Sequence, residues 1–232
     1  MYIQYYLIHG IEPERGVRMM KEFKTWGLDP NKVKWILEPN KDQISEEMRK
    51  SVLIQEASES CGCNVPPGCP NLTQGSVSCT YKHYLCIKDI VENNYEYGVI
   101  MEDNQYFCGP IEKTVEKYID QLNIMYPDWD IIFDTNWRKI QHIQEGHTVV
   151  DGVVVYPKSN KMQKEGLAGG TRLAQFYLVN LSCAKKMYQH YIPFNNVPDF
   201  WMNDLFRKLN IQSFWSEPSI SHVFPHVSTV FN

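Results

Sequence analysis

An acidic motif directly follows a short apolar segment near the middle of the chain. Residues 97–101, Tyr-Gly-Val-Ile-Met, are followed by Glu102, Asp103 and Asn104. Such a run is typical of a buried strand, and in open α/β sheets ligands bind outside the carboxyl ends of the strands. Carboxylate and amide oxygens suit a hard divalent cation that keeps coordination sites for phosphate oxygens. The simpler alternative is a polar turn after a core strand.

Three further polar residues stand near predicted helix starts. Arg15 and Arg18 could hold paired oxygens of a nucleobase or a diphosphate, because a guanidinium forks onto such pairs; the alternative is an exposed helix face. Asp199 follows Pro198 at the start of a predicted helix. It is a candidate general base for an acceptor hydroxyl, or simply the N-cap of that helix.

Aromatic and acidic residues at other strand ends suggest an acceptor site. Asp134 and Trp137 follow the predicted strand 129–133, so we expect them at the same sheet edge. Trp137 offers an apolar face for a sugar ring, although core packing is the commoner fate of Trp. His83 would lie near the crevice, or pack against Tyr97.

The elements that must position these residues predict an α/β protein. Pro13 begins a helical pattern that ends at Gly27, between two strand-like segments, and this βαβ start predicts a partly parallel sheet. Ser78 and Ser182 are expected to cap later helices, and Asp151-Gly152 to form the turn of a hairpin over 149–155. The predicted strands are 2–8, 33–37, 97–101, 129–133 and 175–179; predicted helices cover 13–26, 41–57, 78–91 and 111–122, with further helices from 182 and 199.

Length and composition predict one globular domain, residues 1–232. The chain has 232 residues, 43% hydrophobic and 22% charged, as in ordinary globular proteins. Residues 58–78 are rich in Cys, Gly, Pro and Ser and are expected to form a loop. Residues 158–170 are polar and Gly-rich, and we expect a mobile loop that closes over a ligand.

Charge and hydropathy exclude several partner classes. The formal charge of −4 and pI near 6.0, without a Lys/Arg stripe, argue against nucleic acid. No apolar run approaches the roughly 20 residues of a transmembrane helix. The first residues lack the features of a signal peptide, and an odd count of seven cysteines fits a reducing compartment. We therefore expect a cytoplasmic protein; the oligomeric state is open.

A group of cysteines allows a separate interpretation. Cys61, Cys63, Cys69 and Cys79 could form a four-thiolate zinc site, although a Cys-x-Cys pair departs from the usual spacing. Unpaired thiols, or one disulfide outside the cell, are the alternatives.

Several segments, taken in order, resemble glycosyltransferase family 25, the lipopolysaccharide and collagen sugar transferases. The first strand with Arg15 and Arg18 is similar to the family's opening, and residues 75–83 resemble its Gly-Cys-x-x-Ser-His helix start, with Lys82 in place of Ser. Residues 97–104 resemble its strand ending in Glu-Asp-Asp, with Asn104 in place of the last Asp. Residues 176–199 and Glu217-Pro218 resemble its late segments.

The resemblance implies a GT-A-like (Rossmann-like) fold with a mixed, mainly parallel sheet flanked by helices. It also implies a nucleotide-sugar donor, expected to be UDP-linked, and Mn²⁺ (or Mg²⁺), with inverting transfer of a hexose to a glycan or protein hydroxyl. Glu102, Asp103, Arg15, Arg18 and His83 would bind the donor.

By the same resemblance, Asp103, Asn104 and a late histidine, His222 or else His226, would hold the metal. Asp199 would be the base. Asp134 and Trp137 are expected at the acceptor from their strand-end position and not from the resemblance. Because the amide of Asn104 brings no charge, we expect weaker metal binding. Two alternatives remain: a non-catalytic sugar- or partner-binding protein on a degenerate transferase fold, and a zinc-stapled interaction domain around the cysteine loop.

Overall fold

The computed structural model describes residues 2–54, 72–135, 150–158 and 173–223. Its α-helices are α1 Pro13–Thr25, α2 Glu46–Val52, α3 Gln74–Asn93, α4 Ile111–Met125, α5 Leu181–Tyr188 and α6 Pro198–Leu209, with 3₁₀ turns η1 Pro30–Lys32 and η2 Lys41–Gln43. The strands are β1 Ile3–Ile8, β2 Val33–Ile36, β3 Tyr97–Glu102, β4 Gln105–Phe107, β5 Ile131–Phe133, β6 Val155–Pro157, β7 Phe176–Asn180, β8 Ser213–Ser216 and β9 Ser221–Val223.

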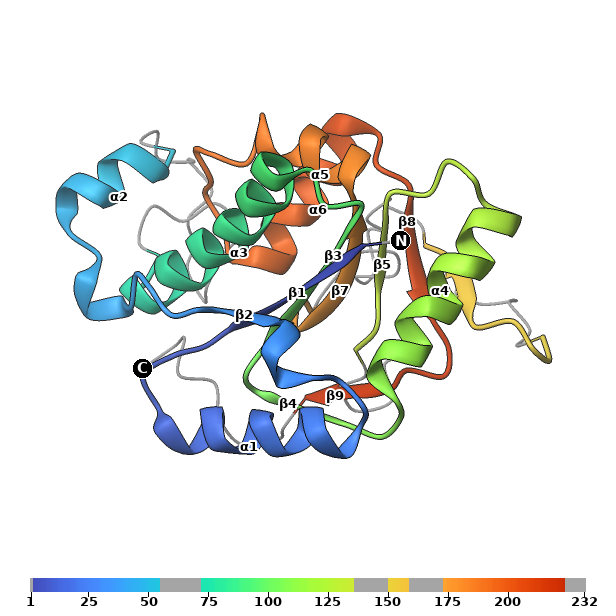
Figure 1. Ribbon diagram of the computed structural model, residues 1–232. Helices are drawn as coiled ribbons and strands as arrows, with labels where there is room; N and C mark the ends of the chain where they lie inside the picture. The colour runs from blue at the N-terminus through green and yellow to red at the C-terminus, as the bar shows by residue number, and fades with distance from the viewer. Residues whose placement is uncertain (1, 55–71, 136–149, 159–172, 224–232) are drawn as a thin grey trace, which may run out of the picture.

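Seven strands form one mixed sheet in the order β2-β1-β3-β7-β5-β8-β6. The pairings β2-β1, β1-β3 and β5-β8 are parallel, and only β7 and β6 run against the others. Helices cover both faces of this sheet (Figure 1). The α/β class with a mixed, mainly parallel sheet flanked by helices is therefore confirmed.

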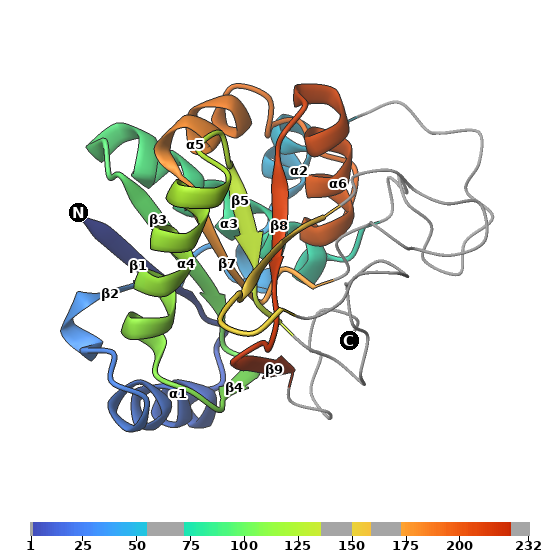
Figure 2. The same cartoon turned by 90° about the vertical axis from the view of Figure 1, so that its right-hand side faces the viewer.

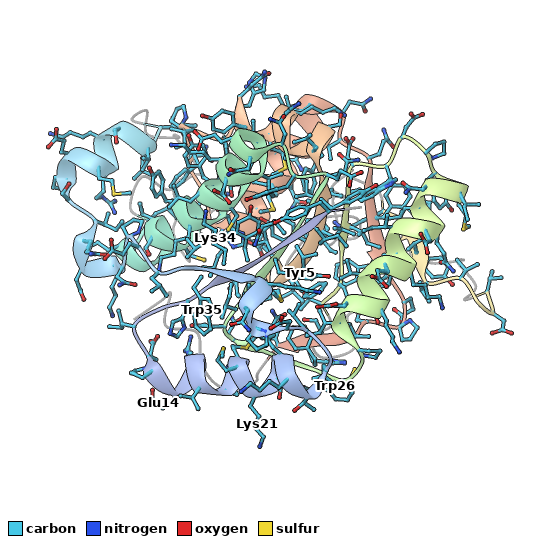
Figure 3. The ribbon with its side chains drawn as sticks, viewed as in Figure 1. Tyr5, Glu14, Lys21, Trp26, Lys34 and Trp35 are labelled. Carbon is cyan, nitrogen blue, oxygen red and sulfur yellow. The ribbon has the colours of Figure 1, made fainter. Side chains whose placement is uncertain are left out.

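Alternating side chains of the strands fill two cores. On β1, Tyr5 and Leu7 pack on the side of α1 and α4, whereas Tyr6 and Ile8 pack on the side of α3, α5 and α6. This alternation is the two-residue period of a strand covered on both faces. Figure 3 shows Glu14 and Lys21 pointing from α1 away from the sheet.

Close packing of α3 on the sheet depends on a glycine. A Cβ at Gly98 would lie 2.1 Å from Cδ1 of Ile90. The absent side chain therefore lets α3 approach β3, and so brings the residues of α3 close to the motif that follows β3.

A second, small sheet was not predicted. Strands β4 and β9 pair antiparallel, with Tyr106 opposite His222, and they lie below the main sheet beside α1 (Figure 2). Three residues per strand are too few for a periodic signal. This pairing joins the segment after the acidic motif to the last described strand.

Several predicted element starts are wrong. Helix α3 begins at Gln74 because the Thr73 hydroxyl accepts a hydrogen bond from the Ser76 N–H. The predicted loop 58–78 therefore ends earlier, and Ser78 lies inside the helix. Helix α5 is capped by Asn180, which accepts from the Cys183 N–H, and not by Ser182.

Two other predictions hold only in part. The predicted helix 41–57 is divided into η2 and α2, which ends at Val52. Asp151-Gly152 does form a turn, with Gly152 at φ +79°, but β6 then pairs with β8 instead of closing a hairpin. Within the described residues, no helix combines the length and apolar character needed to span a bilayer.

A buried lysine makes stability depend on pH. Burial lowers the pKa of Lys158, directly after β6, to about 7, although the charge of Asp199 opposes this shift. Below pH 7 both the folded and the unfolded chain carry the ammonium charge, so the folded chain bears the full free-energy cost of burying that charge. Between pH 7 and the ordinary pKa of 10.5 the unfolded chain binds more protons, so this cost disappears as pH rises.

We therefore expect Lys158→Met to stabilise the protein most below pH 7, where it should raise the unfolding free energy by roughly a few kcal/mol. Near pH 10 the substitution should hardly change the unfolding free energy. Thermal unfolding from pH 5.5 to 10 measures this. The exposed Lys185→Met is the matched control, with an expected change within about 0.5 kcal/mol at every pH. An equal gain for Lys158→Met at all pH values would contradict the prediction.

Candidate functional site

A pocket opens beyond the carboxyl ends of β1 and β3. These parallel strands end together, because Ile8 pairs with both Ile36 and Glu102. Helix α1 packs on one face of the sheet and α3 packs on the other. The pocket therefore lies between β1 and β3, where the strand order reverses, as ligand sites of open α/β sheets do. It encloses ≈ 680 Å³, open mouth included. Its charged lining residues are Glu12, Arg15, Lys41, Lys82, Glu102 and Asp103.

The carboxylate of Asp103 is the centre of the pocket's hydrogen-bond network. Its Oδ2 lies 2.6 Å from Nδ1 of His9 and accepts the Gly10 N–H at 3.0 Å, while its Oδ1 accepts from Arg15 at 3.1 Å. Arg18 donates to the main-chain oxygen of Asp103. Asp103 is 5% exposed. Burial alone would raise its pKa, but the bonds from His9 and Gly10 and the charge of Arg15 hold the pKa below its ordinary value.

The structure thus brings Arg15, Arg18 and Asp103 together, as the sequence predicts for a donor site. Arg15 lines the pocket, and Arg18 fixes the main chain of the acidic motif. Both come from α1, which the βαβ connection places beside the end of β3. Sequence reasoning missed His9, whose signal is its position directly after the first strand.

Glu102 belongs to a second network with α3 and β7. Its Oε1 lies 3.2 Å from Nε2 of His83, and Nδ1 of His83 lies 2.9 Å from the Tyr177 hydroxyl. His83 is fully buried and stacks on Tyr177, not on Tyr97. It therefore orients Glu102 rather than lining the pocket.

Cys79 extends this network, since the ligand atoms of Cys79, His83 and Glu102 lie within 4.8 Å of one another. Burial and the nearby Glu102 raise the pKa of the Cys79 thiol, which opposes metal binding because a thiol ligand must lose its proton. Hydrogen bonds already join two members of the group, His83 and Glu102.

Asn104 carries a side-chain oxygen that no described residue binds. Its Oδ1 is buried and has no hydrogen-bond partner among the described residues. A buried polar atom normally has a partner, and Asn104 lines the pocket. This amide oxygen is therefore available to a ligand.

The predicted divalent metal does not fit this donor set. Both oxygens of Asp103 already accept from protein donors, and Nε2 of His222 lies 3.2 Å from Sγ of Cys108 on the β4–β9 side. Glu102 and Asn104 are the remaining members of the predicted group, and the ammonium of Lys82 lies in the same pocket lining. A hard cation needs several unshared oxygens, and a fixed positive charge nearby opposes it.

Lys82 occupies an unusual position on the buried face of α3. Its Nζ donates to the main-chain oxygen of His9 at 2.8 Å and to Oδ1 of Asn40 at 3.2 Å, and the residue is 2% exposed. Burial lowers its pKa, while Cys79, Asp103 and Glu12 oppose that shift. The ammonium thus joins the loops that follow β1 and β2. Its sequence signal is a lysine directly before His83, where the resemblance has Ser.

Asp199 lies in the first turn of α6, whose N-cap is Val197, so the prediction that Asp199 caps the helix is wrong. Its Oδ1 accepts from the Phe200 N–H at 2.9 Å. Asp199 is not among the residues that line the pocket, and its charge opposes the lowering of the Lys158 pKa.

Asp134 is an anchor in the core and not a pocket residue. It is 1% exposed, and it accepts hydrogen bonds from the Tyr118 hydroxyl at 2.8 Å and the Ile220 N–H at 2.9 Å. Burial raises its pKa to about 6. This carboxyl therefore fixes the chain before β9 instead of presenting an oxygen to an acceptor.

Some predicted residues lie outside the described part of the chain: Trp137, His226, residues 159–170 and three cysteines, Cys61, Cys63 and Cys69. The zinc and mobile-loop predictions therefore stay predictions. Lys158, the first residue of that predicted loop, is buried.

Comparison with known proteins gives one family. Residues 40–202 match Glycosyltransferase family 25 (LPS biosynthesis protein). "Glycosyltransferase 25 family member" of Aedes aegypti is 24% identical over 220 residues, covering 89% of this chain and 33% of that protein. "Procollagen galactosyltransferase 1-B" of Xenopus laevis is 32% identical over 82 residues, 35% of this chain and 13% of that protein. The chain thus spans a third or less of the length of these relatives.

Among solved structures, a glycosyltransferase involved in glycosylation of the major capsid of PBCV-1 has a TM-score of 0.42 at 9% identity, covering 97% of this chain and 95% of that one. Mouse xyloside xylosyltransferase 1 has a TM-score of 0.38 at 12% identity, covering 91% and 71%.

The role of Asp134 can be tested by removing its carboxyl. We expect Asp134→Ala to lower the unfolding free energy by about 2–4 kcal/mol, because it leaves the buried donors of Tyr118 and Ile220 without acceptors. Chemical denaturation measures this change. Asp120→Ala on the exposed face of α4 is the control. The Asp134→Ala protein should still bind its ligand below its melting temperature, because Asp134 does not line the pocket. A stable Asp134→Ala protein would show that the carboxyl is not an anchor.

Proposed function

The chain belongs to glycosyltransferase family 25, and from this membership we propose that it transfers a hexose from a nucleotide sugar to a hydroxyl group on a glycan or protein acceptor. We propose a UDP-linked donor. Galactose is the first hexose to test, because relatives of this chain are named procollagen galactosyltransferases. Glucose and other hexoses remain alternatives.

The pocket at the ends of β1 and β3 supports this proposal. A diphosphate needs fixed donors, and the pocket lining offers the guanidinium of Arg15 and the ammonium of Lys82. Asp103 holds Arg15 and Gly10 in place. The donor phosphates would lie here, and Asn104 Oδ1 would accept from a hydroxyl of the nucleotide sugar.

Asp199 is the proposed general base. The acceptor hydroxyl gives its proton to the Asp199 carboxylate while its oxygen attacks the anomeric carbon of the donor sugar. The bond from that carbon to the diphosphate oxygen breaks, and the nucleoside diphosphate leaves with the electron pair. Attack opposite the leaving group inverts the anomeric configuration. Trp137 keeps its predicted role at the acceptor.

The metal predicted from the family resemblance is not part of this mechanism, because the described donor set does not fit it. For location, we propose a reducing compartment such as the cytoplasm. The four described cysteines, Cys79, Cys86, Cys108 and Cys183, are all free thiols, and this is consistent with such a compartment.

A second candidate function is non-catalytic binding of a sugar nucleotide. Asn104 supports it, because an amide replaces an acidic side chain in the motif that would serve the leaving group. Such a protein would bind the nucleotide sugar and leave its glycosidic bond intact. Release of the nucleoside diphosphate separates the two functions.

Calorimetric titration with UDP and a panel of UDP-hexoses tests the donor site. We expect binding that Asp103→Ala weakens by at least about tenfold, because Arg15 and Gly10 then lose their common acceptor. Asp42→Ala on exposed η2 is the control and should bind normally. If no nucleotide binds to the folded wild-type protein, the transferase proposal fails.

The base is tested by Asp199→Asn. We expect transfer, or slow donor hydrolysis in the absence of acceptor, to fall by about 10²- to 10⁴-fold, with UDP binding retained. Asp204→Asn, on the same helix but paired with Arg207 at the surface, should keep full activity. Full activity of Asp199→Asn would move the base elsewhere.

A further inference from the structure

Among the residues that the structure describes, the lining of the pocket is electrically balanced without any added ion. Its charged lining consists of three acids, Glu12, Glu102 and Asp103, and three bases, Arg15, Lys41 and Lys82. Counting His9 as neutral, these formal charges cancel. A site built around a divalent cation needs a surplus of negative charge, and this lining has none.

The balance depends on the two positions where this chain departs from the motifs it resembles. Lys82 and Asn104 are this chain's own residues; by the resemblance, the helix start would have Ser at the first position and the acidic motif would have a second Asp at the other. With Ser and Asp at these positions, the same lining would hold four acids and two bases. Its formal charge would be −2, which one divalent cation neutralises.

Both departures therefore act in the same electrostatic direction at the same pocket. One removes a carboxylate and the other adds an ammonium. The ammonium is held rigidly, because Nζ of Lys82 donates to the His9 oxygen at 2.8 Å and to Oδ1 of Asn40 at 3.2 Å. It has three N–H donors, and these two acceptors leave one for a ligand. Arg15 lines the same pocket, so two fixed cations serve one subsite.

We propose that Lys82 is the built-in cation of the diphosphate subsite, and that nucleotide binding and transfer by this chain need no divalent metal. The inference rests on the proposed function, since it assigns a nucleoside diphosphate to this pocket. During transfer, negative charge grows on the departing diphosphate oxygen, and a bound metal would stabilise it as a Lewis acid. Here Lys82 and Arg15 supply that stabilisation through hydrogen bonds to the phosphate oxygens.

The first test compares UDP binding to the wild-type protein in EDTA and in Mn²⁺ by calorimetry. We expect dissociation constants that agree within about twofold. Lys82→Met should weaken binding by at least about tenfold in either condition, because a partly buried charge pair is lost. Lys88→Met, farther along α3 and paired with Glu92 at the surface, is the matched control and should bind as the wild type does.

The decisive variant restores both motif residues, Lys82→Ser with Asn104→Asp. We expect this protein to bind UDP only when Mn²⁺ is present, with at least about a tenfold difference between Mn²⁺ and EDTA. Asn104→Asp alone should weaken UDP binding, because it adds a negative charge beside the diphosphate. Thermal unfolding of each variant shows whether its pocket is folded.

The outcomes distinguish this inference from the proposed function. If the wild-type protein binds UDP only with Mn²⁺, or if folded Lys82→Met binds UDP normally, the built-in cation is refuted while the transferase proposal stands. If the wild-type protein binds no nucleotide in EDTA or in Mn²⁺, both are refuted. Should the double variant fail to fold, the comparison of wild type in the two solutions still decides.

Discussion

The carboxylate of Asp103 is the contact on which the arrangement of the site depends. It collects donors from the loop after β1 and from α1, namely His9, Gly10 and Arg15. A buried carboxylate is costly unless it is fully paired, so these groups must converge for the fold to be stable. The bond to Arg15 also holds its guanidinium in the lining of the pocket. The hydrogen bonds of Asp103 therefore both stabilise the fold and position the residues of the site.

Lys82 has a similar double role from the opposite face of the sheet. It reaches from α3 to the oxygens that follow β1 and β2, and α3 comes this close because Gly98 has no side chain. Asp103 and Lys82 thus fix the two sides of one crevice with opposite charges. Neither is a surface residue whose charge water would screen, so both act on a ligand at short range.

Much of this arrangement follows from the sequence, and the reasons for the rest are specific. The acidic motif, Arg15 and Arg18 are predictable because strand ends and a βαβ connection determine where they meet. The burial of Asp134 is not, because its donors, Tyr118 and Ile220, lie far apart in sequence. Likewise, its position at a strand end does not reveal that both carboxylate oxygens of Asp103 already have hydrogen-bond partners within the protein. The starts of α3 and α5 are not predictable from residue type, because Thr73 and Ser78, like Asn180 and Ser182, all belong to the types that cap helices.

The pairing of β4 with β9 has a consequence for the order in which the protein forms during synthesis. Tyr106 finds its partner only when His222 has been made, and β8 must enter between β5 and β6, which are already present. Contacts of such long sequence separation form late. Residues up to His222 must therefore leave the ribosome before the segment after the acidic motif can settle, and a chain that still lacks them leaves strand edges exposed to chaperones and aggregation.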